Sequence, residues 1–167
     1  MNNIDILKGE ISLDIKVNVE GVILNCRSAG FILKNNKILL HKEKKVNFWA
    51  PIGGKVKIME SSVDAVKREY KEELDIEVEV ERLIWMAENF FEFEGKKYHE
   101  YTFVYLLIDV NDVLSCEDEE ISVLNEKQFV YKWIDLDEIN KLSVKPGFLS
   151  GNLEKLPKQL VHVIYKD

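Results

Sequence analysis

The sequence predicts an α+β fold of layered type, in one domain that spans residues 1–167. Three observations support this class. Several segments on both sides of the centre of the chain alternate apolar with polar residues or are continuously apolar, as strands do. One segment, residues 61–74, has an uninterrupted helical pattern. The 167 residues, 46% of them hydrophobic, contain no internal repeat or linker and suffice for one substantial core.

The part of the chain before the helix predicts three strands, over residues 17–24, 30–34 and 37–41. Asn35 and Asn36 separate the second strand from the third. Because Asn tolerates positive φ angles, this pair predicts a tight hairpin.

The helix is expected to begin after Ser61, a good N-cap residue, with Asp64 three residues later as a shortened capping box. Nothing interrupts the helix before residue 74. At about 100° per residue, one stripe of this helix is apolar and is expected to pack on the core. The stripe consists of Val63, Val66, Tyr70 and Leu74.

The second half of the chain predicts more strands and some further helix. Residues 98–110 are almost continuously apolar, which predicts a central strand buried on both faces. The other expected elements are strands over 77–80 and 82–93, a turn over 94–96, a strand over 128–134, a short helix over 135–142, a partly helical stretch over 146–160 and an edge strand over 161–165.

Three carboxylates occupy one sector of the helix beside its apolar stripe. Glu69, Glu72 and Glu73 lie within roughly 100° of one another, and such charges repel at helical spacing. A hard divalent cation would supply a reason to cluster them, since Mg²⁺ takes oxygen ligands and shares carboxylates with substrate phosphate. Arg68 lies four residues before Glu72 and can hold that carboxylate in place. The alternative interpretation is a merely solvated acidic helix.

A glycine pair precedes the helix and has a defined spacing to these carboxylates. Gly53 and Gly54 allow a close approach of the backbone to a ligand. Gly54 is followed after five residues by Glu60, and after seven more by Arg68-Glu69, with Glu72-Glu73 close behind. This spacing resembles the signature of the Nudix (MutT-like) hydrolase family. Two positions depart from the family pattern: Asp75 replaces the usual Gly, and Tyr70 fills a position that is more often aliphatic.

The resemblance implies a Nudix-type α/β/α sandwich with a mixed central sheet, and a Mg²⁺ site in which Mn²⁺ can substitute. Glu72, Glu73 and the carbonyl of Gly53 would be metal ligands, and Glu69 would be a ligand or the base that activates water. Glu60 would brace the glycine loop, and Arg68 would orient the carboxylates. The implied activity is hydrolysis of the pyrophosphate linkage in a nucleoside diphosphate joined to another moiety. The alternative is a catalytically silent Nudix-like module that senses a nucleotide.

Substrate contacts outside the signature are predicted at fewer positions. Lys42 follows a predicted strand where relatives often hold a basic residue near phosphate, although an exposed basic turn is an equal alternative. Lys55 directly follows the glycine pair. Trp49 is a candidate for stacking on a base, whereas most aromatic residues in strands are simply core. The sequence leaves open whether the substrate is a nucleoside triphosphate, ADP-ribose, a nucleotide sugar, a dinucleoside polyphosphate or capped RNA.

Two further glutamates are candidates to complete the site from facing elements. Glu100 lies in an apolar strand, so its carboxylate needs a partner if it points inward. Glu126 precedes the strand expected over residues 128–134. Glu100 is favoured narrowly as a catalytic base, and the alternative is that both glutamates are solvated surface charges.

Composition limits the partners. A net charge of −7 argues against sequence-independent binding of duplex nucleic acid but allows a small-molecule nucleotide, since a bound metal inverts the local charge. The sequence has no apolar run of membrane-spanning length, and its N-terminus lacks the apolar core of a signal peptide. Cys26 and Cys116 have no metal-site spacing and are expected to be reduced thiols in a cytoplasmic protein. The oligomeric state stays open, with a homodimer among the alternatives.

Overall fold

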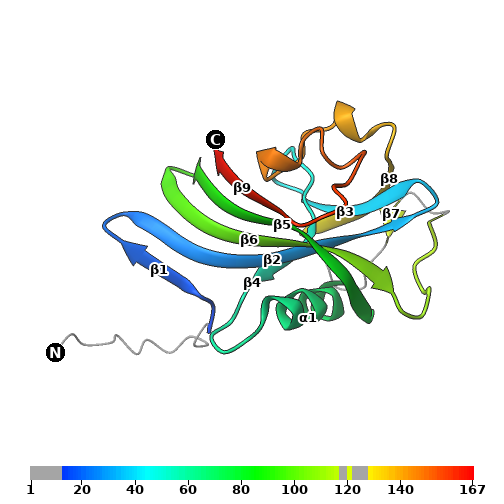
Figure 1. Cartoon of the computed structure of the whole chain (residues 1–167), viewed down its shortest axis with the longest axis horizontal. Coiled ribbons are helices and arrows are strands. Elements are labelled where there is room, and N and C mark those ends of the chain that lie inside the picture. Colours follow the sequence, from blue (N-terminus) through cyan, green and yellow to red (C-terminus); the bar gives the residue numbers. More distant parts are fainter. Residues whose placement is uncertain (1–12, 117–119, 122–127) are drawn as a thin grey trace.

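The computed structural model describes residues 13–116, 120–121 and 128–167. In this part of the chain the strands form one curved, mixed sheet in the order β7-β8-β3-β2-β6-β5-β9, and β1 and β4 also pair with β2 (Figure 1). The strands are β1 (Lys16–Val19), β2 (Val22–Lys34), β3 (Lys37–Glu43), β4 (Ile52–Lys55), β5 (Val78–Phe93), β6 (Lys96–Asp109), β7 (Glu120–Ile121), β8 (Phe129–Asp135) and β9 (Val161–Lys166). The pairs β2–β6 and β5–β9 are parallel and the others antiparallel, which confirms the mixed sheet.

The long strand β2 organises the sheet. One of its edges pairs with β6 over residues 22–32. Its other edge pairs in turn with β1, with β4 over residues 27–30, and with β3 at Leu33 and Lys34. This arrangement places the glycine pair of β4 directly beside the centre of β2, where the site is built.

The hairpin at Asn35 and Asn36 is confirmed, with φ angles of 51° and 61°. The single strand expected over residues 17–24 is wrong, because the chain turns back at Glu20 and Gly21, where φ is 50° and 85°. Gly in the middle of an apolar pattern marked this turn. The strand pattern predicted over 77–80 and continuing over 82–93 forms one strand, β5, whose register shifts twice against β6.

The helix α1 (Ser62–Leu74) is confirmed, and it packs against one face of the sheet (Figure 1). The Ser61 Oγ accepts a hydrogen bond from the Asp64 N–H at 3.0 Å, as an N-cap does. The stripe residues Val66, Tyr70 and Leu74 are buried in a core cluster with β-strand residues such as Ile32 and Ile52. The hydroxyl group of Tyr70 donates a hydrogen bond to the Gly30 carbonyl at 3.1 Å, a contact that an aliphatic residue could not make.

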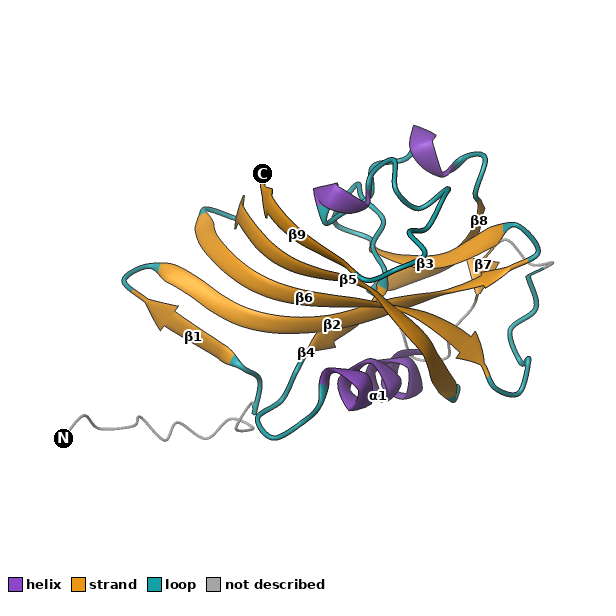
Figure 2. Ribbon diagram, in the orientation of Figure 1, coloured by secondary structure: helices purple, strands orange, loops and turns teal. Residues whose placement is uncertain are grey.

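The opposite face of the sheet is covered by residues 136–160, which are mostly loop (Figure 2). Their apolar side chains pack with Phe31 and Trp85 in a second core cluster. The short helix expected over 135–142 is present only as the 3₁₀ turn Ile139–Lys141, and the partly helical stretch expected over 146–160 contains only the 3₁₀ turn Gly147–Leu149. The Pro and Gly residues between 146 and 157 break a longer helix. The layered α+β class is confirmed, with loops in place of a second helical layer.

No helix in the part of the chain that the structure describes combines the length and the apolar character needed to cross a lipid bilayer.

Asp75 ends α1 in the left-handed conformation, with φ 56° and ψ 31°, where its N–H donates to the Lys71 carbonyl. We therefore expect Asp75→Gly to raise the free energy of unfolding by about 0.5–1 kcal/mol through relief of backbone strain. The Lys71–Asp75 ion pair, at 2.7 Å, is exposed to solvent, so its loss offsets only a small part of this gain. Urea denaturation of the variant measures the change. Clear destabilisation would show that the Asp75 side chain matters more than its backbone conformation.

Candidate active site

Arg68 is the centre of a hydrogen-bond network that joins α1 to the loop before it. Its guanidinium donates to both carboxylate oxygens of Glu60, at 2.7 and 3.0 Å, and to the Lys55 carbonyl at 3.1 Å. It also donates to Glu69 at 2.6 Å and to Glu72 at 3.1 Å. The hydrogen bond from Arg68 lowers the pKa of Glu60, and the same contacts raise the pKa of Arg68. Arg68 therefore contacts three carboxylates, those of Glu60, Glu69 and Glu72, and it links Glu60 to the backbone of Lys55.

Glu69 lies directly over Gly54. A Cβ atom at Gly54 would stand 2.2 Å from Glu69 Oε1, so only glycine leaves room for this carboxylate. Burial raises the pKa of Glu69 and the ion pair with Arg68 opposes the shift, while Glu73 and Glu72 raise the pKa further. A desolvated carboxylate beside two others is a group that a bound cation would stabilise.

Glu73 is held from the other side by two strands of the sheet. Its Oε2 atom accepts a hydrogen bond from the Tyr131 hydroxyl at 2.8 Å and lies 3.1 Å from Nδ1 of His41. The imidazole of His41 is buried and stacks on Phe129, with 4.9 Å between the ring centres. Three aromatic residues of β3 and β8 therefore fix the position of this carboxylate.

Gly53 presents its carbonyl group to Arg27. The guanidinium of Arg27 donates a hydrogen bond of 2.6 Å to the Gly53 oxygen. Gly53 has a φ angle of 157°, and a Cβ atom there would stand 2.2 Å from the Ser28 carbonyl oxygen. This position accepts only glycine, because β4 and β2 approach closely here.

The oxygen donors of this region fit a hard divalent cation in their chemistry. Within the described residues, no three His, Cys, Asp or Glu side chains converge as a formed metal site. Protein donors contact the candidate oxygens: Arg68 at Glu69 and Glu72, His41 and Tyr131 at Glu73, and Arg27 at Gly53. Carboxylate and carbonyl oxygens are the ligand types that Mg²⁺ prefers.

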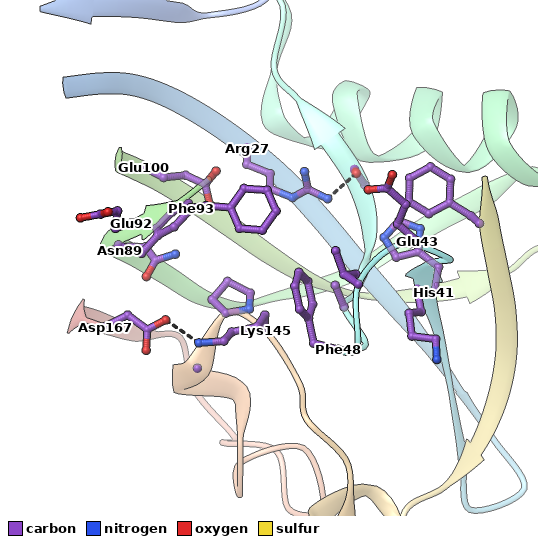
Figure 3. A pocket seen from close by; sticks show the side chains of 18 residues that line it. Arg27, His41, Glu43, Phe48, Asn89, Glu92, Phe93, Glu100, Lys145 and Asp167 are labelled. Carbon is purple, nitrogen blue, oxygen red and sulfur yellow. Dashed lines mark hydrogen bonds and ion pairs between the residues drawn. The ribbon is translucent and has the colours of Figure 1, made fainter. Parts of the chain in front are cut away.

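A cavity of about 390 Å³ lies next to this region, and Gly53 and His41 belong to its lining. Asn89 and Glu100 lie at one end of the cavity, and His41 and Glu43 lie at the other (Figure 3). Arg27 and Lys42 line the same space. The cavity therefore extends from the glycine loop across the face of the sheet to β5.

The three predicted substrate-binding residues have different surroundings in the structure. Lys42 lines the cavity, with its Nζ 5.1 Å from the centre of the Trp49 ring. Trp49 itself packs against the core cluster that contains Phe31 and Trp85, and it is not among the residues that line the cavity. The Lys55 side chain forms an ion pair with Asp14 at 3.3 Å. Of the three, only Lys42 faces the space that a substrate could enter.

The structure does not bring Glu100 close to the helix carboxylates. In the sheet Glu100 aligns with Asn25, whereas Gly53 aligns with Ala29, four residues farther along β2. At 3.3 Å per residue this offset is about 13 Å along the strand direction. Glu100 lies in the cavity wall instead, where its oxygens accept hydrogen bonds from Asn25 at 3.0 Å and Thr102 at 2.8 Å. Glu126 lies outside the described residues.

Arg27, His41, Asn89 and Tyr131 belong to the site or its cavity and were not predicted. All four lie in strands far from the helix in the sequence, so motif spacing could not find them. The sequence around them gave little signal, because Arg27 stands in the polar run Asn25-Cys26-Arg27-Ser28 and Asn89 directly follows Glu88.

Gly54→Ala provides a test of the contact between Gly54 and Glu69. The obstructing atoms belong to the end of a flexible side chain, so we expect the fold to persist while the Glu69 carboxylate moves away. If that carboxylate contributes to catalysis, the variant should lose about 10-fold to 100-fold in kcat with a change of less than about 1 kcal/mol in stability. Activity and thermal unfolding of the same preparation check this. Unchanged kcat would mean that the position of Glu69 does not matter.

Comparison with known proteins places these features in context. The NUDIX domain family matches residues 24–150, which include β4, α1 and most of the sheet. No curated protein sequence matches the chain.

Solved structures share the fold at low sequence identity. A MutT protein from Bacillus halodurans is 19% identical, with a TM-score of 0.60 over 85% of this chain and 89% of its own. An ADP-ribose pyrophosphatase from Streptococcus suis is 17% identical, with a TM-score of 0.52 over 84% of this chain and 98% of its own. A NUDIX hydrolase from Nitrosomonas europaea is 16% identical, with a TM-score of 0.52 over 86% of this chain and 79% of its own.

Proposed function

The chain belongs to the Nudix family, and we propose that it is a Mg²⁺-dependent pyrophosphohydrolase that acts on a nucleoside diphosphate linked to another moiety. One observation carries this proposal. The carboxylates of Glu69, Glu72 and Glu73 lie on α1, which follows the Gly53–Gly54 loop, and a cavity lined by Gly53 and by the cationic side chains of Arg27, Lys42 and Lys145 adjoins that loop.

Glu72 and Glu73 are the proposed principal metal ligands, with the Gly53 carbonyl and Glu69 as the other candidates. The bound Mg²⁺ would polarise the phosphoryl oxygens and stabilise charge on the leaving group, and Mn²⁺ has the same ligand preferences. The Gly53 carbonyl oxygen has two lone pairs, and the hydrogen bond from Arg27 uses one of them, so the other could face a cation. A substrate phosphate is a stronger partner for a guanidinium than a carbonyl is, so substrate binding would draw Arg27 from Gly53 toward the phosphate.

The other residues of the site position groups and supply charge. Arg68 holds Glu69 and Glu72 in place, and the pair His41 and Tyr131 holds Glu73. Arg27 and Lys42 are the cations that line the cavity near the glycine loop, so we assign them to phosphate oxygens.

The reaction adds one water molecule across a P–O–P bridge. The water oxygen bonds to one phosphorus atom, the bridging P–O bond breaks, and a proton leaves the attacking water. If Glu69 is not itself a metal ligand, it is the proposed acceptor for this proton. Burial raises the pKa of its carboxyl group, which makes the carboxylate a better base.

The alternative of a catalytically silent nucleotide sensor has less support. A silent module would be expected to have lost carboxylates, whereas this chain keeps Glu60, Glu69, Glu72 and Glu73. Arg68 contacts the first three of these carboxylates, and Tyr131 contacts the fourth.

A substrate screen tests the proposal. The purified protein is incubated with nucleoside triphosphates, ADP-ribose, nucleotide sugars, dinucleoside polyphosphates and capped RNA, with Mg²⁺ or Mn²⁺ and with EDTA as the control. Product nucleotides are separated by ion-exchange chromatography, and ¹⁸O-labelled water identifies the phosphorus that is attacked. We expect metal-dependent cleavage of at least one class. Absence of cleavage in all classes with both metals would overturn the proposal.

A further inference from the structure

A row of polar side chains crosses three neighbouring strands at the end of the cavity that lies away from Lys42. Asn25 on β2 aligns with Glu100 on β6, which aligns with Asn89 on β5. Glu100 accepts hydrogen bonds from Asn25 Nδ2 and from Thr102 Oγ1, so its carboxylate is fixed in place. Asn89 and Glu100 both line the cavity (Figure 3).

Asn89 is a buried amide that the protein leaves unused. It is only 4% exposed, and its Oδ1 atom has no hydrogen-bond partner among the described residues. Asn25 Oδ1, in the same row, is also buried and without a partner there. Buried polar groups are normally paired, so an unpaired amide in a cavity wall indicates a group that a ligand satisfies. Because an amide can turn about its terminal torsion, either its oxygen or its nitrogen can face the ligand.

The surroundings of Asn89 suit a flat ring. Phe48, Phe91 and Phe93 line the same cavity, and a volume of about 390 Å³ is within the usual range for small-ligand pockets. Aromatic side chains offer faces and edges on which a heteroaromatic ring stacks.

The hydrogen-bonding groups of this wall also favour one kind of ring. The Asn89 amide provides one acceptor and two donors, whereas the Glu100 carboxylate, which accepts hydrogen bonds from Asn25 and Thr102, provides acceptors. Lys145 is paired with Asp167, and Arg27 lies toward the Gly53 carbonyl that it binds. The wall therefore offers more acceptors than donors, which suits a ring rich in N–H groups.

We propose that Asn89 and Glu100 bind the base of the nucleotide and select bases that carry an exocyclic amino group. The amide pairs with an adjacent donor and acceptor on the edge of the base, and the carboxylate accepts the additional N–H. This inference rests on the proposed function only for the identity of the ligand as a nucleotide. It assigns Glu100 to substrate recognition in place of proton abstraction, because Glu100 is offset from the glycine loop along β2.

Equilibrium binding tests the proposal without turnover. Isothermal titration calorimetry compares guanosine with inosine 5′-monophosphate, which differ by one amino group, and cytidine with uridine 5′-monophosphate. These probes contain no pyrophosphate bridge, so the measurement is independent of hydrolysis. We expect the amino-bearing member of each pair to bind about tenfold more tightly, the value of one hydrogen bond to a charged acceptor.

Variants assign the preference to these residues. Asn89→Leu should weaken binding of every base and Glu100→Gln should reduce the preference within each pair, since Gln adds donors. Asn89→Asp keeps the shape and removes the donors, so it replaces Asn89→Leu if that variant does not fold. Asn140→Leu, at an exposed position, is the matched control and should bind as wild type does.

The outcomes separate this inference from the catalytic proposal. The inference is overturned if the two members of each pair bind equally. It is also overturned if Glu100→Gln keeps the wild-type preference and the Asn89 variant binds as tightly as wild type. Either result counts even if the protein hydrolyses nucleotides. A clear preference that these variants abolish supports it even if the substrate screen finds no hydrolysis.

Discussion

If Glu72 and Glu73 are the metal ligands that we propose, Glu73→Gln and Glu72→Gln are each expected to lower kcat by about 10²-fold to 10³-fold, because each would remove one charged ligand worth several kcal/mol in the transition state. The side chain keeps its size, and the glutamine oxygen can still accept the hydrogen bond that Tyr131 donates to Glu73. Steady-state kinetics at saturating Mg²⁺ measures the loss, with the best substrate from the screen.

The two variants should differ in stability rather than in activity. Glu73 has a side-chain exposure of 16% and Glu72 of 54%, so only the first substitution changes a largely buried contact. We expect the unfolding free energy to change by about 1 kcal/mol or less for Glu72→Gln, while Glu73→Gln weakens the contacts to His41 and Tyr131. Glu79→Gln, which breaks the exposed ion pair with Lys67, is the matched control and should retain full activity. Near-normal turnover in either helix variant would show that its carboxylate is not a metal ligand.

The helix and its carboxylates were predictable because their information is local. Cap residue, apolar stripe and carboxylate spacing all lie within residues 61–75, and a helix converts that spacing directly into positions in space. The left-handed Asp75 could be predicted for the same reason. Short-range rules of this kind hold wherever tertiary packing agrees with them.

The cavity wall was not predictable from the sequence, because strand register determines it. Asn25, Glu100 and Asn89 come together only through the pairing of β2 with β6 and of β6 with β5, over separations of up to 75 residues. The same register places Glu100 far from Gly53 along β2, although both residues had been candidates for one site. The prediction of helix near the C-terminus overestimated its extent for a different reason. Apolar residues near Pro146 and Gly147 pack on the core from a loop, so their apolar pattern does not require a helix.

Arg68→Met is expected to destabilise the protein by about 2–4 kcal/mol, because it leaves partly buried carboxylates without their cation. The side chains of Glu60 and Glu69 are each 15% exposed, and Arg68 is 20% exposed. Methionine preserves most of the aliphatic packing, so the loss reports the charge and its hydrogen bonds. For a chain of this size the expected fall in Tm is about 5–12 °C.

Lys67→Met is the matched control, since it removes the same charge from the adjacent residue of α1. Its partner Glu79 is 63% exposed, so this exposed pair should contribute less than about 1 kcal/mol. The combination of Glu60→Gln with Arg68→Met tests the network further, because removing the buried charge at Glu60 should restore part of the stability lost in Arg68→Met alone. If Arg68→Met unfolds at the same temperature as Lys67→Met, the contacts of Arg68 do not stabilise the fold. The kcat of Glu60→Gln tests whether the Arg68–Glu60 contact also matters for catalysis. If this variant keeps its stability but has a lower kcat, the contact between the loop and α1 is needed to hold Glu69 in position over Gly54.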